Sequence, residues 1–232
     1  MKKILLALFV MCSALSFSAK VIKSDRIEAK GNVIYEIGQK TPFTGVLENY
    51  DEKGVLDARA EFKNGVMDGY SKLYYPSGKL SSEATFKNGV QVGIQKDYYE
   101  DGKLKMELNY KNGKAEGLGR SYYPNGKVFI EENYKNGERD GEFKRYYLNG
   151  NLLMRYYFKA ENVEGPWEDY YPNGKLLMSG QMKANKEVGN WKYYDENGNL
   201  LGEAPYNQIP KAIRDAKEKN IDQFWKDIKS GK

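Results

Sequence analysis

The chain has 232 residues, with 37 lysines and arginines, 32 aspartates and glutamates, and no histidine. This near balance of charge gives no support to nucleic-acid binding, which usually shows a marked basic excess or a basic stripe. Without histidine, and with Cys12 as the single cysteine, structural zinc sites and Cys-His or Ser-His-Asp catalysis are excluded, and no cofactor or metal is expected.

Residues 1–19 have the layout of a secretory signal peptide. Two lysines are followed by an apolar run, Ile4–Met11, and by a small, mostly polar stretch that ends near Ala19. The run is too short to span a bilayer as a helix. We therefore expect an exported protein that is periplasmic, surface-exposed or secreted. The alternatives are a buried N-terminal helix and a lipid on Cys12, although the residues before Cys12 lack the small side chains of a lipoprotein signal.

Residues 20–44 come before the regular part of the chain. Asn32–Ile37 predicts a short strand, and Thr41–Thr44 leads from it into the first regular position. Because the ends of a repeat array need covering, we expect this region to act as an N-terminal strand and cap.

Residues 45–206 repeat with a period of 24 residues. A fixed period of that length is the signature of a repeat array, here of about six and a half copies. No insertion breaks the count. The two glycine columns that mark the period are Gly45, Gly69, Gly93, Gly117, Gly141, Gly165 and Gly189, and Gly54, Gly78, Gly102, Gly126, Gly150, Gly174 and Gly198.

Each copy is predicted to be a β-hairpin. A Pro-x-Gly turn such as Pro124–Gly126 joins its strands, and a Lys-Asn-Gly turn such as Lys111–Gly113 ends the copy, because glycine suits the left-handed positions of such turns. The second strand alternates apolar and polar residues, as a half-buried strand does. The first-tyrosine column is then expected on the buried face, with Tyr74 opposite Leu80. This column comprises Tyr50, Tyr74, Tyr98, Tyr122, Tyr146, Tyr170 and Tyr194.

Residues 207–232 are predicted to form a C-terminal helix. Pro210 opens it, and apolar residues follow at helical spacing as far as Lys229. We expect the helix to cover the open edge or the apolar face of the last hairpin. Dimerisation or binding at a membrane surface are the alternatives, but charges of both signs on the polar face favour capping. The apolar face comprises Ile213, Ala216, Ile221, Phe224, Trp225 and Ile228.

A second tyrosine column is the candidate binding surface. It is expected on the face opposite the first column, next to lysines that follow the turns, since tyrosine is enriched in interfaces. Two tryptophans in the last copies add a candidate aromatic patch. The structural alternatives are tyrosines that pack on one another and tryptophans that pack under the C-terminal helix. The candidates are Tyr75, Tyr99, Tyr123, Tyr147, Tyr171, Lys79, Lys103, Lys127, Lys175, Trp167 and Trp191.

These columns resemble the MORN repeat family, and more closely its bacterial variant. The matching segments include Tyr122–Val128, Tyr170–Leu176 and Tyr110–Lys114, and the resemblance covers about residues 33–206. It implies an elongated, single-layer antiparallel sheet of successive hairpins that is used mostly for protein or membrane association. Bacterial relatives are often described as antitoxins, a cytoplasmic role that an export signal does not fit.

The sequence thus predicts an exported, non-enzymatic repeat scaffold that binds a protein partner or a cell surface. The alternatives are a membrane-surface binder of anionic lipid, an antitoxin-like partner protein, and a glycan hydrolase that uses paired carboxylates such as Glu107 and Glu131. Those glutamates lie in the exposed column of the second strand, which favours a solvated face over a catalytic pair. The oligomeric state and the partner's identity are left open.

Overall fold

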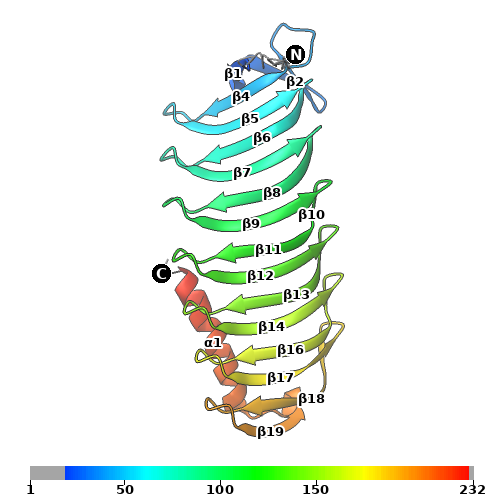
Figure 1. The fold of residues 1–232 in the computed structure, drawn as a ribbon, viewed down its shortest axis with the longest axis vertical. Coiled ribbons are helices and arrows are strands. Elements are labelled where there is room, and N and C mark those ends of the chain that lie inside the picture. Colours follow the sequence, from blue (N-terminus) through cyan, green and yellow to red (C-terminus); the bar gives the residue numbers. More distant parts are fainter. Residues whose placement is uncertain (1–18, 230–232) are drawn as a thin grey trace, which may run out of the picture.

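The computed structural model describes residues 19–229, so the predicted signal peptide lies outside the described residues except for Ala19. Within that range one long sheet of 17 strands runs the length of the molecule, with a helix along one side (Figure 1). This confirms the predicted all-β array of hairpins that ends in a helix. The first part of the chain contains β1 (Val21–Lys23), η1 (Ser24–Arg26), β2 (Ile27–Lys30), β3 (Val33–Glu36), β4 (Gly45–Tyr50), β5 (Leu56–Lys63), β6 (Val66–Tyr74), β7 (Leu80–Lys87), β8 (Val90–Tyr98) and β9 (Leu104–Lys111).

The second part continues the same sheet. Successive strands pair antiparallel. In two copies the first strand is divided into two short strands, β10 and β11 in one and β15 and β16 in the other, and each pair follows the path that a single strand takes in the other copies. The elements are β10 (Lys114–Ala115), β11 (Gly117–Tyr122), β12 (Val128–Lys135), β13 (Glu138–Tyr146), β14 (Leu152–Lys159), β15 (Asn162–Val163), β16 (Gly165–Tyr170), β17 (Leu176–Lys183), β18 (Lys186–Tyr194), β19 (Leu200–Pro205), η2 (Tyr206–Gln208) and α1 (Lys211–Lys229).

The two predicted turns explain the period. In the Lys-Asn-Gly turns both central residues have positive φ, 53° at Asn112 and 76° at Gly113, which is the conformation that matches the twist of a tight hairpin. Later copies keep this backbone with less suitable residues: Ala184 has φ 49° and Asn185 has φ 63°. The turn geometry is therefore set by the array as well as by the local residues.

The N-terminal cap is larger than the sequence indicated. The predicted strand is present as β3, but it pairs with β2 in a separate two-stranded sheet. The edge of the long sheet is instead covered by β1, which pairs parallel with β4. Phe43 and Val46 are buried beneath this cap.

The C-terminal helix covers an apolar face, one of its two predicted positions. It runs back along the ends of the hairpins from β18 to β12 (Figure 1). Phe224 packs against Tyr123 and Phe129, and Ile213 joins a cluster around Trp191. Trp225, predicted on the apolar face, is 46 % exposed, and the side chain of Ile228 lies outside the described part. No helix within residues 19–229 combines the length and the apolar character needed to cross a membrane.

A charged pair also crosses the interface between helix and sheet. Lys217 Nζ lies 3.2 Å from Asp169 Oδ2, and the same oxygen accepts a hydrogen bond from Trp167 Nε1 at 2.8 Å. Burial raises the pKa of Asp169. Burial opposes the charge on Lys217, but the Asp169 carboxylate and the Tyr206 hydroxyl together outweigh this effect and raise the pKa of Lys217. The pair therefore contributes to where the helix lies on the sheet.

The two tyrosine columns lie on opposite faces, as predicted, but the prediction that the first column is the buried one is wrong, because the second column is buried. Tyr74 does pair with Leu80, but the register shifts beside it, between Leu73 and Tyr74. First-column hydroxyls reach glutamates on the polar face, as Tyr98 does with Glu83. The second column lies on the other face, where its last three members are buried with the helix side chains: Tyr123, Tyr147 and Tyr171.

Candidate functional site

A row of residues that are all charged except Ser179 runs along the face opposite the helix. Each member is directly opposite the next across a strand pair, so the row crosses the whole sheet. We call it the charge ladder. Its members are Glu48, Arg59, Lys72, Glu83, Lys96, Glu107, Arg120, Glu131, Lys144, Arg155, Glu168, Ser179, Lys192 and Glu203.

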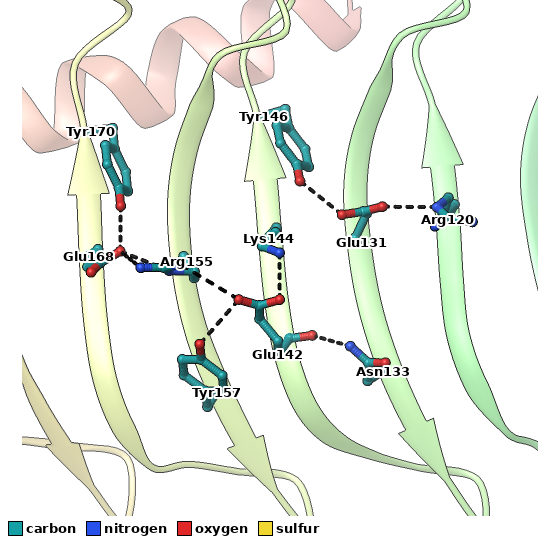
Figure 2. Close-up of polar contacts among 10 residues, drawn as sticks. All are labelled: Arg120, Glu131, Asn133, Glu142, Lys144, Tyr146, Arg155, Tyr157, Glu168 and Tyr170. Atoms are coloured by element: carbon teal, nitrogen blue, oxygen red, sulfur yellow. Dashed lines mark hydrogen bonds and ion pairs between the residues drawn. The ribbon is translucent and has the colours of Figure 1, made fainter. Parts of the chain in front are cut away.

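The middle of the charge ladder is internally neutralised (Figure 2). Arg120 Nε lies 2.9 Å from Glu131 Oε1, and Arg155 Nη2 lies 2.6 Å from Glu168 Oε2. Lys144 Nζ lies 2.5 Å from Glu142 Oε2. Burial opposes ionisation of Glu131, but hydrogen bonds from Arg120 and from a tyrosine hydroxyl hold the pKa of Glu131 below its usual value. The charged groups in this part of the face are therefore paired with one another within the protein.

The N-terminal part of the charge ladder is different. Neither Lys72 nor Lys96 forms an ion pair with any described residue, although both lie directly opposite Glu83. Glu83 instead accepts a hydrogen bond from the Tyr98 hydroxyl at 2.6 Å. Burial, with this hydrogen bond, raises the pKa of Tyr98 to about 12. The two lysines therefore keep their charges available to solvent or to a partner.

Large apolar side chains lie beside these lysines on the same face. Tyr70, Ile94 and Leu118 follow the column glycines of three successive copies and are 60 %, 53 % and 38 % exposed. Later copies carry Glu142, Pro166 and Asn190 there. Exposed apolar residues grouped together indicate an interaction site more strongly than isolated ones do. Together with the basic ladder residues they form the Tyr70 surface, which comprises Arg59, Tyr70, Lys72, Ile94, Lys96 and Leu118.

Two adjoining hollows lie in the Tyr70 surface. One, of about 320 Å³, is lined by Arg59, Glu61, Tyr70, Lys72 and Tyr74. The other, of about 440 Å³, shares Tyr70 and Lys72 with it and continues to Ile94 and Lys96. Both are shallow and mixed in polarity, which suits side chains of a partner better than an enclosed small molecule.

The second tyrosine column, predicted as a binding surface, joins consecutive copies. Each hydroxyl donates a hydrogen bond to the backbone carbonyl oxygen of the first-column tyrosine in the next copy. The distances are 2.6 Å for Tyr75, 2.5 Å for Tyr99, 2.8 Å for Tyr123, 2.6 Å for Tyr147 and 2.9 Å for Tyr171. Only Tyr75 and Tyr99 lie beyond the reach of the helix and are partly exposed. The three buried members are inaccessible while the helix is docked.

The other predicted surface residues also contact neighbouring copies or the core. All four predicted lysines are exposed, and Lys103 and Lys127 also donate hydrogen bonds to turn carbonyl oxygens of the next copy, at 2.9 Å and 2.8 Å. The Trp167 ring stacks on Tyr156 with centroids 4.3 Å apart. Trp191 is buried against Tyr206, so it offers no patch to a partner.

Glu107 and Glu131, the candidate catalytic pair, both belong to the charge ladder. Arg120 lies between them, 3.7 Å from Glu107 and 2.9 Å from Glu131. A glycosidase needs one carboxyl group with a raised pKa as its general acid, whereas the pKa of Glu131 is lowered. The geometry is that of a structural ion pair. Among the described residues, no group of acidic residues is arranged to hold a metal ion.

The Tyr70 surface was not among the predicted sites, although the sequence carries a signal for it. The position after the column glycine holds Val46, which is buried, then Tyr70, Ile94 and Leu118, and then polar residues or proline. The change from apolar to polar residues is not visible in the columns that repeat, because the position after the column glycine varies between copies. A break in composition between copies marks where the array differs along its length.

Comparison with known families gives one match. The MORN repeat variant matches the chain six times, at residues 67–88, 91–112, 115–136, 139–160, 163–184 and 187–208, which together make up more than half of it. No curated protein matches significantly. Among solved structures, the crystal structure of a GtfA/B complex bound to UDP and GlcNAc is similar at 15 % identity, over 58 % of this chain and 24 % of that one. The TM-score is 0.20, so this likeness carries no argument about function.

Proposed function

Because the chain belongs to the MORN repeat variant family, we propose that it is an exported, non-enzymatic scaffold that holds a partner protein on its polar face. The array is a rigid series of hairpins, and arrays of this kind use extended surfaces to bind. The partner contacts the N-terminal half of that face. Farther along the array, the charges of Arg120, Lys144 and Arg155 are paired within the protein, and α1 covers the opposite face (Figure 1).

The observation that carries the proposal is the Tyr70 surface. Tyr70 and Ile94 are more than half exposed, and they adjoin two lysines without ion pairs. The centres of protein interfaces are enriched in exposed aromatic residues of this kind, with polar residues around them. The same positions in later copies, Glu142 and Asn190, carry polar side chains. These copies therefore serve as an internal control for binding at the Tyr70 surface.

Export is the second part of the proposal. It is supported by the basic start and the apolar run at Ile4–Met11, which are typical of a cleaved secretory signal. Cell fractionation followed by N-terminal sequencing of the mature protein tests it. A mature chain that begins near Ala19 and lies outside the cytoplasm supports export, and an uncleaved cytoplasmic chain contradicts it.

Site-specific photo-crosslinking in intact cells tests the binding function. A photoreactive phenylalanine analogue is placed at Ile94, and the matched control places it at Asn190, the same repeat position in the last copy. We expect a discrete protein adduct at Ile94 and none at Asn190. The purified adduct partner is then expected to bind the wild-type protein and to bind the Tyr70→Ser variant more weakly.

Two outcomes would refute the binding function. Identical adducts at the two positions would show that the Tyr70 surface is not the contact. Adducts made only with lipid would assign the face to a membrane instead of a protein.

A further inference from the structure

The lysines of the Tyr70 surface lack the acidic partner that Lys144 has at the same position of a later copy. Lys72, Lys96 and Lys144 occupy the same position in different copies. Lys144 contacts Glu142, two residues before it on the same strand and the same face, at 2.5 Å. Before Lys72 and Lys96 that position holds Tyr70 and Ile94. The array therefore shows which group belongs beside this lysine, namely a glutamate carboxylate.

The acidic residues nearest to Lys72 and Lys96 are already engaged. Glu61 Oε2 accepts a hydrogen bond from the Tyr70 backbone N–H at 3.1 Å. Glu83 accepts one from the Tyr98 hydroxyl at 2.6 Å. Glu107, directly opposite Lys96, accepts one from the Tyr122 hydroxyl at 2.7 Å. Each carboxylate thus has its own partner, and no described carboxylate forms an ion pair with either lysine.

The array also sets the spacing of any matching ligand. Equivalent residues in successive copies are two strands apart, which corresponds to about 9.6 Å along the sheet. A polyproline II segment has three residues per turn and advances about 3.1 Å per residue, so every third side chain points the same way after about 9.3 Å. Apolar contacts at Tyr70, Ile94 and Leu118 and charged contacts at Lys72 and Lys96 follow this one spacing.

We propose that the Tyr70 surface recognises a segment of the partner in polyproline II conformation, in which aspartate or glutamate and a large apolar residue each recur at every third position. The carboxylates lie beside Lys72 and Lys96, in the place that Glu142 occupies beside Lys144. The apolar side chains lie against Tyr70, Ile94 and Leu118 and enter the hollows between them. This inference rests on the proposed function, because it specifies the chemistry of the protein partner.

Peptide binding to the mature full-length protein tests the inference. The probe is a fluorescent peptide of about 15 residues with the repeat Glu-Phe-Ser, long enough to cross the three copies. A peptide of the same composition in shuffled order tests the spacing, and a Lys-Phe-Ser repeat tests the charge. Fluorescence anisotropy is expected to show binding of the first peptide alone, weakening as salt is added.

Single substitutions then locate the contact. Lys72→Gln and Lys96→Gln are each expected to weaken binding by about two- to five-fold, the range for an exposed ion pair. The matched control, Lys192→Gln, changes the same position in the last copy, where Asn190 replaces the apolar residue, and is expected to leave binding unchanged. Circular dichroism confirms that all variants are folded.

Several results would overturn the inference. One is equal binding of the ordered and shuffled peptides, and another is equal weakening by Lys72→Gln and Lys192→Gln. Binding of anionic phospholipid vesicles through Lys72 and Lys96, without peptide binding, would assign the surface to lipid. A protein adduct at Ile94 without binding of the Glu-Phe-Ser peptide would refute this inference and leave the proposed function standing.

Discussion

Replacing Phe224 by alanine is expected to detach α1 from the sheet and to leave the hairpins paired. Phe224 is completely buried. Its ring centre lies 6.4 Å from that of Tyr123 and 6.2 Å from that of Phe129. The Arg145 guanidinium lies 4.7 Å from the ring centre on another side. The side chain therefore holds the C-terminal half of the helix, whereas the strands are held by their own backbone hydrogen bonds.

The size of the effect follows from this burial. A buried phenylalanine removes about 150–250 Å² from water, and at about 25 cal/mol per Å² this stabilises the docked helix by about 4–6 kcal/mol. Phenylalanine-to-alanine changes in protein cores cost about 3–5 kcal/mol. Most of a helix's stability in a protein comes from packing of its apolar face. A loss of this size is therefore expected to leave α1 largely undocked.

Hydrogen exchange measured segment by segment by mass spectrometry separates the two parts of the molecule. In Phe224→Ala the amides of α1 are expected to lose protection, and those of β5–β8 are expected to keep it. The matched control is Trp225→Ala, one residue away and 46 % exposed, which is expected to retain protection in α1. Full protection of α1 in Phe224→Ala, or equal loss across β5–β8, would refute the reasoning.

Three further predictions concern the contacts within the array. Tyr147→Phe removes a buried hydrogen bond of 2.6 Å to the Tyr170 carbonyl oxygen and is expected to lower the free energy of unfolding in urea by about 1–3 kcal/mol. The control Tyr75→Phe, where water can replace the hydroxyl, is expected to lower it less. Equal losses in the two variants would contradict this account. The folded pKa of Glu131 lies below the ordinary 4.5, so its contribution to the free energy of unfolding is present above the unfolded pKa and is lost as pH falls through the folded pKa. Glu131→Gln is therefore expected to flatten the fall of Tm between neutral and acidic pH. An unchanged slope would argue against this. Ala184→Asn places a residue that tolerates left-handed backbone at φ 49° and is expected to raise the free energy of unfolding by about 0.5–1 kcal/mol; a lower Tm would contradict this.

The hairpins were predictable from sequence because their determinants are local. A turn with two positive φ angles needs asparagine and glycine, and these residues recur in phase, as at Asn112 and Gly113. The helix was predictable for the same reason, from apolar residues at helical spacing. Each of these signals lies within a few residues, so no knowledge of distant contacts is required.

The assignment of faces depended on contacts that are not local. The register shift beside Tyr74 and the path of α1 together decide which tyrosine column is buried. One sequence change does mark that path. The position after Leu80 and its equivalents in the other copies holds Asp57, Ser81 and Lys105 in the early copies. It becomes apolar in the copies that the helix covers, with Phe129, Leu153 and Leu177.

The candidate binding surface was only partly within reach of sequence analysis. The tyrosine and lysine columns stand out because they repeat, and most of them join one copy to the next. Tyr70 and Ile94 stand out only when the paired strands show that Lys72 and Lys96 share their face and lack ion pairs. Repetition therefore identifies the residues that build the array more readily than those that distinguish one copy from another.

The position of α1 divides the molecule into an adjustable end and a fixed end. Each hairpin contacts only its neighbours in the sheet, and the helix lies on Tyr123, Tyr147 and Tyr171 alone among the second-column tyrosines. One more 24-residue copy inserted before Gly117 would lengthen the polar face by about 9.6 Å without disturbing the helix. A copy removed from beneath α1 would take away part of its contact surface. Length can thus be gained or lost at the N-terminal end, in steps that keep the face in register, while the last three hairpins remain a constant base.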